Sequence, residues 1–148
     1  MKLQHVAFSG LAGTSAMTLF SYIAAVKTEE SNQKIPLLLG ELLKEILPES
    51  CRHQAPLAGW LSHFSIGVSW AWVYDYLYQN TEVRPSLKNG LILGSCSGLL
   101  GVAIWKIIFK MHPHPPRTNL KKFFIQLYLA HLVYSVAITA LNKQPGTG

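Results

Sequence analysis

The sequence predicts an all-α integral membrane protein: a four-helix bundle with one short amphipathic helix between the first and second spans. Two observations support this fold class. Charged residues make up only 14% of the 148 residues, whereas an average soluble domain has ~25%. Four stretches are also apolar over the ~20 residues that a helix needs to cross a bilayer. These stretches are residues 4–26, 57–78, 89–109 and 122–141. They leave room only for short connections, so we interpret residues 1–148 as a single transmembrane domain.

The first stretch is typical of a membrane span rather than of a secretory signal peptide. It is longer than the apolar region of most signal peptides, and small and hydroxyl-bearing residues interrupt it. Small residues of this kind allow two membrane helices to approach closely. We therefore expect Gly10 and Gly13 to lie at a helix contact.

The longest connection, residues 27–56, contains the amphipathic helix, which we expect at 36–47. Pro36 is compatible with the first turn of a helix, and Pro48 ends the pattern. Leucine and isoleucine recur on one face, with charged residues opposite. The segment is too short to cross a bilayer, so we expect it to lie in the interface or to fold back against the bundle as a packing element. A role in sensing curvature or docking a partner is the alternative.

Glycines in the second and third spans predict further helix contacts. In the third span, glycine recurs at every fourth residue, which aligns the missing side chains on one face. This face can serve the protein's own bundle, which we favour, or a neighbouring subunit. In the second span, two glycines bracket His63 at the same spacing and indicate a complementary groove. The glycines concerned are Gly59, Gly67, Gly90, Gly94 and Gly98.

Polar groups inside a span are the default candidates for function, and few are present. In the fourth span, His131, Ser135 and Thr139 share one face and should point inward, because polar groups facing lipid are costly. We expect His131 to donate a hydrogen bond to a neighbouring helix. Asp75 is expected to pair with Lys88 or Arg84 at the interface.

Two further ionisable groups, Lys106 and His63, lie in the third and second spans. We expect the side chain of Lys106 to extend to the lipid head groups. Two histidines on separate helices could hold a haem iron. At about 1.5 Å of rise per residue, however, His63 lies about 8 Å and His131 about 14 Å inside the same membrane surface, so both could reach one iron only if the helices are substantially tilted. We therefore expect hydrogen-bonded histidines at helix contacts, with no metal and no cofactor.

The remaining motifs do not favour catalysis, metal binding or nucleic-acid binding. Ser, Cys and Thr lie in no nucleophile motif, and no glycine-rich loop joins a strand to a helix, so we do not expect an enzyme. The segment from His112 to Pro116 could hold a surface metal weakly, but an extended proline-rich turn explains it. The net charge of +6 lies mainly beside the spans, which indicates contact with lipid head groups and not with nucleic acid.

The distribution of lysine and arginine predicts the orientation. These residues are concentrated around the connections 27–56 and 110–121, which places both connections in the cytoplasm and both termini outside.

Several short motifs follow one another along the chain: Gly10 to Thr14, His63 to Ile66, Gly90 to Gly94, Pro115 with Pro116, and His131 to Val133. In this order they resemble the motifs of small bacterial inner-membrane proteins of unknown function, the YagU-type group and its relatives. The resemblance implies a multi-pass protein of the bacterial inner membrane with no assigned activity or cofactor. It also implies basic termini on the inside, opposite to the charge count. Gln126 departs from the group, in which a carboxylate often precedes the histidine of the fourth span.

Three hypotheses for function follow. The first is an accessory or structural subunit that packs against partner subunits in a larger membrane complex through its glycine face. The second is a small carrier or conduit, as a monomer or by self-association as a homo-oligomer, with a polar path along the fourth span through His131, Ser135 and Thr139 and with His63 as a proton-sensitive group. The third is a haem or metal protein that uses the histidines.

Overall fold

The computed structural model describes residues 3–28, 34–112, 114 and 119–143, and all regular secondary structure in them is helical. The elements are α1 (Leu3–Thr28), α2 (Ile35–Ile46), the 3-10 helix η2 (Glu49–Gln54), α3 (Ala55–Asn80), α4 (Leu87–Met111) and α5 (Leu120–Asn142). The all-helical prediction is therefore confirmed for these residues.

Three of the helices, α1, α4 and α5, are long and apolar enough to cross a membrane, by length and composition. The sequence also predicts a span at 57–78, the second along the chain, and α3 covers it but does not belong to this set. The helix is long enough, but its aliphatic residues alternate with Trp, Tyr and Ser and with the polar side chains of His63 and Asp75.

Local sequence signals explain where the helices begin. The Ser86 hydroxyl accepts a hydrogen bond from the Asn89 amide at 3.2 Å and caps α4. The Asn119 side chain caps α5 in the same way. Both α2 and α3 have proline in the first turn, where a missing amide hydrogen costs nothing.

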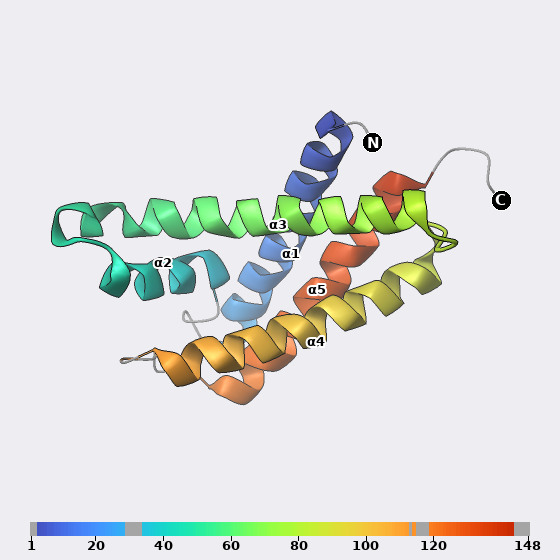
Figure 1. Ribbon diagram of the computed structural model, residues 1–148. Coiled ribbons are helices and arrows are strands. Elements are labelled where there is room, and N and C mark those ends of the chain that lie inside the picture. Colours follow the sequence, from blue (N-terminus) through green and yellow to red (C-terminus); the bar gives the residue numbers. More distant parts are fainter. Residues whose placement is uncertain (1–2, 29–33, 113, 115–118, 144–148) are drawn as a thin grey trace.

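Figure 1 shows how the helices are arranged. α1 packs against α3 and α5, and α4 packs along α5. α3 and α4 are joined by a short turn at one end and diverge from it, and α2 packs along α3 at the open end (Figure 1). The helices α1 and α5 are inclined to α3 and do not run parallel to it (Figure 1).

The amphipathic segment forms α2 and folds back onto the other helices. Its buried side chains Ile35, Leu38 and Leu42 share a hydrophobic cluster with Trp105 of α4 and Phe123 of α5. A second cluster, centred on Tyr74 and Tyr134, joins α1, α3 and α5. Because α2 fills the space at the open end, α3 and α4 are held apart there.

Candidate functional site

The glycine face of α4 packs against α5 of the same chain. A Cβ atom on Gly94 would lie 2.8 Å from the Ser135 Cβ and 3.2 Å from the Leu132 Cα. Gly90 faces Thr139 in the same way, and Gly98 faces Tyr128. The structure therefore uses this face for its own fold.

The glycines of α1 and α3 serve other contacts. Gly10 packs against the backbone of α3, and Gly13 packs against the side chains of α5. Gly59 contacts the backbone of α2, and Gly67 contacts Thr14 of α1. The predicted groove between the α3 glycines and the glycine face of the third span is therefore wrong, because α1 and α2 occupy that side of α3.

The hydroxyl groups of the predicted polar stripe are buried at helix contacts. Ser135 donates to the carbonyl of Gly90 in α4. The hydroxyl groups of Thr139 and Tyr78, on α5 and α3, are hydrogen-bonded at 2.8 Å. Both stripe residues point inward, as expected, but they form a packed contact rather than an open path.

Asp75 has a different partner from the one predicted. The residue is only 2% exposed, and both carboxylate oxygens accept from Gln79 Nε2 at 2.8 Å. In the described part of the chain, neither Arg84 nor Lys88 forms an ion pair with it. Gln79 is one turn further along the same helix, a spacing that could have indicated this pair.

Asp75 also lines a polar pocket where the beginning of α1 and the end of α5 come together. His5, at the beginning of α1, is hydrogen-bonded to Asn142, at the end of α5, at 3.2 Å. Pro85, in the turn between α3 and α4, borders the same pocket. The ends of four helices therefore lie at one end of the molecule.

Lys106 is exposed on α4, and its extension to the lipid head groups stays a prediction. Its Nζ atom lies 5.5 Å from the centre of the Phe124 ring, a distance at which the cation is attracted to the ring.

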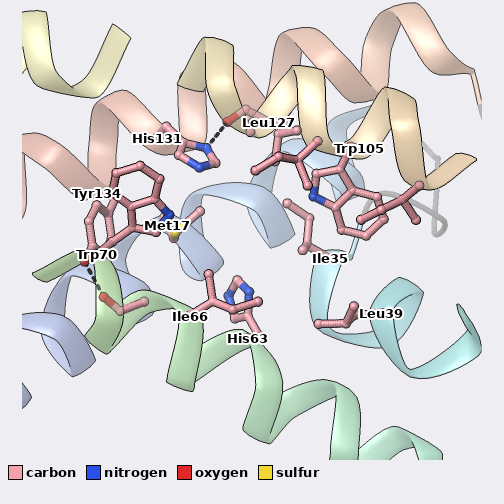
Figure 2. Close-up of a pocket in the computed structure, with 14 residues that line it drawn as sticks. Met17, Ile35, Leu39, His63, Ile66, Trp70, Trp105, Leu127, His131 and Tyr134 are labelled. Atoms are coloured by element: carbon pink, nitrogen blue, oxygen red, sulfur yellow. Dashed lines mark hydrogen bonds between the residues drawn. The ribbon is translucent and has the colours of Figure 1, made fainter. Parts of the chain in front are cut away.

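His63 and His131 line one pocket, which is the main finding at this site. The pocket has a volume of about 300 Å³, and the two rings approach it from α3 and α5 (Figure 2). Their depths along the helices differ, so we expected both rings to reach one site only with substantial tilt, and α3 and α5 are indeed inclined to each other (Figure 1).

The walls of this pocket are apolar and aromatic. The lining residues come from α1, α2, α3, α4 and α5 and include Trp70 and Trp105. Ile66 of α3 and Ile104 of α4 also line the pocket. Figure 2 shows how these side chains surround the cavity. The full set is Met17, Ile35, Leu39, His63, Ile66, Gly67, Trp70, Gly101, Ile104, Trp105, Ile108, Leu127, His131 and Tyr134.

The hydrogen bonds of His63 determine where its proton lies. The Thr18 hydroxyl has one hydrogen, which it donates to the Thr14 carbonyl at 2.6 Å. The same oxygen lies 2.9 Å from His63 Nε2, so it must accept from that nitrogen. Neutral His63 is therefore protonated on Nε2, and its Nδ1 atom is a hydrogen-bond acceptor.

The tautomer of His131 follows from a similar argument. Its Nδ1 atom lies 2.8 Å from the Leu127 carbonyl oxygen, which can only accept. Neutral His131 is therefore protonated on Nδ1, and its Nε2 atom is an acceptor. The ring faces inward, as expected, but the expected bond to a neighbouring helix is wrong, because the carbonyl belongs to α5 itself.

Two residues that shape this pocket, Gly101 and Thr18, are not among the site residues predicted from the sequence. A Cβ atom on Gly101 would lie 3.0 Å from His131 Nε2, so glycine makes room for the ring. Thr18 orients His63 from α1. Gly90, Gly94 and Gly98 recur at every fourth residue, and Gly101 follows three residues after the last of them. This additional glycine in the same span was the signal available in the sequence.

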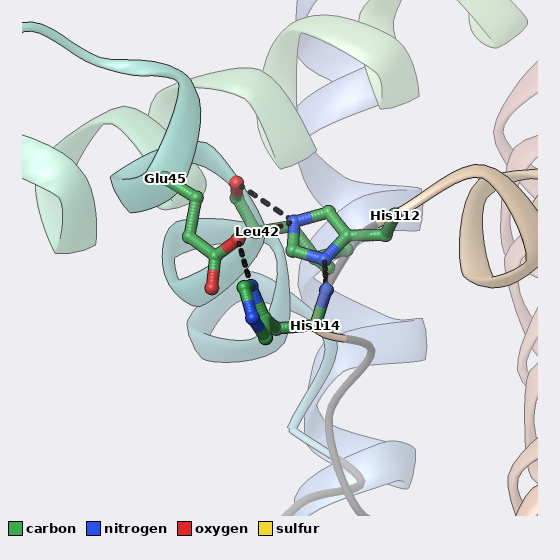
Figure 3. Close-up of polar contacts among 4 residues, drawn as sticks. All are labelled: Leu42, Glu45, His112 and His114. Carbon is green, nitrogen blue, oxygen red and sulfur yellow. Dashed lines mark hydrogen bonds and ion pairs between the residues drawn. The ribbon is translucent and has the colours of Figure 1, made fainter.

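A separate polar contact joins α2 to the end of α4 (Figure 3). His112 Nε2 lies 3.4 Å from the Leu42 carbonyl oxygen and 3.8 Å from Glu45 Oε2. His114 Nδ1 lies 3.4 Å from the same carboxylate oxygen. The neighbouring Pro115 and Pro116 of the predicted turn lie outside the described residues.

Among the residues that the structure describes, no group of three or more His, Cys, Asp or Glu side chains is arranged to hold a metal ion. Comparisons with protein-family models, with curated proteins and with solved structures gave no match. The resemblance to the YagU-type group therefore stays a prediction.

Proposed function

We propose that this protein is a four-span membrane protein that binds a small apolar compound from the bilayer in the pocket between α3, α4 and α5. Such a site suits a small carrier or a subunit that holds a lipid-phase ligand. The single observation that supports it is the cavity of about 300 Å³ with apolar walls and two imidazole rings. Ligand pockets are usually of this kind, with mainly apolar walls and a few placed polar groups.

The outer surface supports a position in the bilayer. Large apolar side chains on all four long helices are more than half exposed, which would be unfavourable in water over so wide an area. Examples are Phe8 on α1, Leu61 on α3, Leu99 on α4 and Ile125 on α5. Within this proposal α3 also crosses the bilayer, which gives four spans in all, and the protein is located in the bacterial inner membrane implied by the YagU-type resemblance.

The position of the pocket supports entry from the lipid phase. Ile66 and Ile104 border it, and both side chains are exposed on the outer surface. An apolar compound in the bilayer could therefore reach the cavity between α3 and α4 without crossing the polar ends of the protein.

Tryptophan fluorescence provides a direct test. The chain has four tryptophans, and Trp70 and Trp105 line the pocket. In a variant with Trp60→Phe and Trp72→Phe, bromododecane should quench the remaining fluorescence in a saturable manner. Unbrominated dodecane should reverse the quenching.

Two substitutions on α4 distinguish the pocket from the lipid-facing surface. Gly101→Leu places a side chain against His131 inside the pocket and should abolish saturable quenching. Ala103→Leu adds the same side chain on an exposed position of α4 and should leave it unchanged. Equal quenching in both variants would reject the proposal.

An accessory subunit is the second candidate, and an apolar hollow on α5 favours it. Leu132, Val133, Val136 and Ala137 line this hollow, which suits a helix of a partner subunit. Ala137→Trp should fill the hollow and remove partners that copurify in mild detergent. Ala140→Trp, on an exposed position of the same helix, is the control. Mass spectrometry that finds no partner with the unmodified chain would reject this candidate.

A further inference from the structure

The two histidines give the pocket a specific polarity. Each neutral ring uses its protonated nitrogen for an internal hydrogen bond, His63 to Thr18 and His131 to Leu127. The second nitrogen of each ring, His63 Nδ1 or His131 Nε2, therefore has a lone pair and no hydrogen. The polar atoms that the two imidazole rings offer to a ligand are therefore acceptors, whereas the indole N–H groups of Trp70 and Trp105 are donors.

An acceptor in an apolar cavity selects its ligand by hydrogen bonding. A hydroxyl group of the ligand could donate to it, whereas an ether or a carbonyl oxygen could not, because that oxygen is itself an acceptor. Two acceptors left without a donor would disfavour a pure hydrocarbon of the same shape, because unpaired buried polar groups are costly.

The walls favour an aromatic ligand. Trp70, Trp105 and Tyr134 present rings to the cavity alongside the two imidazoles, as Figure 2 shows. Aromatic rings pack favourably against one another in tilted and offset arrangements. The edges of the pocket at Ile66 and Ile104 are apolar, which suits an alkyl substituent that extends toward the bilayer.

From these observations we infer that the pocket binds a phenolic compound of the lipid phase, with its hydroxyl group donating to a histidine nitrogen. This inference rests on the proposed function and specifies its ligand class. The histidine tautomers provide acceptors for the hydroxyl group, and the aromatic side chains of the walls pack against the phenol ring. The apolar border between α3 and α4 lets the compound enter from the bilayer.

Three probes of nearly equal size test the inference by displacement of bromododecane. They are para-nonylphenol, its methyl ether and nonylbenzene. The phenol should displace the quencher at a concentration about five- to tenfold lower than the other two, the effect of about one net hydrogen bond. His131→Phe keeps a ring but removes the acceptor and should reduce this preference. His53→Phe, in the exposed 3-10 helix η2, should keep it.

The outcomes separate the inference from the proposed function. Equal displacement by all three probes would overturn the phenol inference while leaving an apolar binding site. Unsaturable quenching would reject both. Copurified haem, seen as a visible absorption spectrum that His131→Phe abolishes, would also overturn the inference, because the ring nitrogens would then be ligands to iron.

Nitrogen NMR of histidine-labelled protein gives a readout that does not depend on a variant folding. The phenol should shift the resonance of an unprotonated ring nitrogen toward that of a hydrogen-bonded acceptor, and the methyl ether should not. An identical spectrum with both probes would overturn the inference.

Discussion

The Thr18 hydroxyl of α1 and the His63 ring of α3 are joined by a hydrogen bond of 2.9 Å beside the pocket. The two residues are 45 positions apart in the sequence, and both side chains are buried. Thr18 acts as donor to its own helix and as acceptor from His63, which leaves the histidine with one orientation and one tautomer.

We predict that Thr18→Val destabilises the protein. Valine has a similar shape but cannot accept the hydrogen of His63 Nε2, and a buried donor without a partner costs about 1–3 kcal/mol. Thermal unfolding in detergent should show a lower midpoint. Ser15→Ala is the matched control, because this hydroxyl is exposed and bonds only to its own helix. Equal midpoints for the two variants would argue against the role of Thr18.

Gly94→Leu should disrupt the contact between α4 and α5. The new side chain would meet Ser135 and the backbone of Leu132, and overpacking of this kind costs about 1–3 kcal/mol or more. The unfolding midpoint and the elution volume in detergent are the measurements. Ala103→Leu makes a similar addition on an exposed position of α4 and should leave both unchanged, so a variant at Gly94 that behaves like this control would refute the prediction.

Three single-cysteine variants test both the orientation and the number of spans. In a background without Cys51 and Cys96, we would place cysteine at His53, Glu82 or His114, all exposed. The charge distribution predicts that an impermeant thiol reagent labels only the cysteine at position 82 in intact cells, and that the other two react after lysis.

Each labelling pattern has a definite meaning. Labelling at 53 and 114 but not at 82 would reverse the orientation and agree with the YagU-type resemblance. Identical accessibility at 53 and 82 would show that α3 does not cross the bilayer, leaving the three spans that its composition supports.

His112 and His114 should differ in their contribution to stability. The side chain of His112 is 7% exposed and that of His114 is 82% exposed, although both approach Glu45. His112→Ala should lower the free energy of unfolding by about 1 kcal/mol, because a buried hydrogen bond to α2 is lost. Contacts of exposed charges contribute little, so His114→Ala should leave the unfolding curve unchanged. The reverse order would contradict the structure in Figure 3.

The sequence by itself determined which segments form helices and where they begin. These properties are local: a continuous apolar run, a proline in a first turn, or a serine or asparagine cap decides them within a few residues. The α2 segment was predictable for this reason, from Pro36, Pro48 and the apolar face between them. The inward direction of Ser135 and Thr139 was also predictable, because polar groups avoid lipid.

Only the tertiary structure decided which helix each feature meets. The α3 glycines were expected to face the third span, yet they contact α1 and α2. Asp75 was expected to pair with a basic residue, yet its carboxylate accepts a hydrogen bond from Gln79. His63 and His131 line one pocket although a count of residues along parallel helices separates their depths. Helix inclination and the insertion of α2 decide these contacts, and both depend on packing between segments far apart in the chain, which a local pattern does not specify.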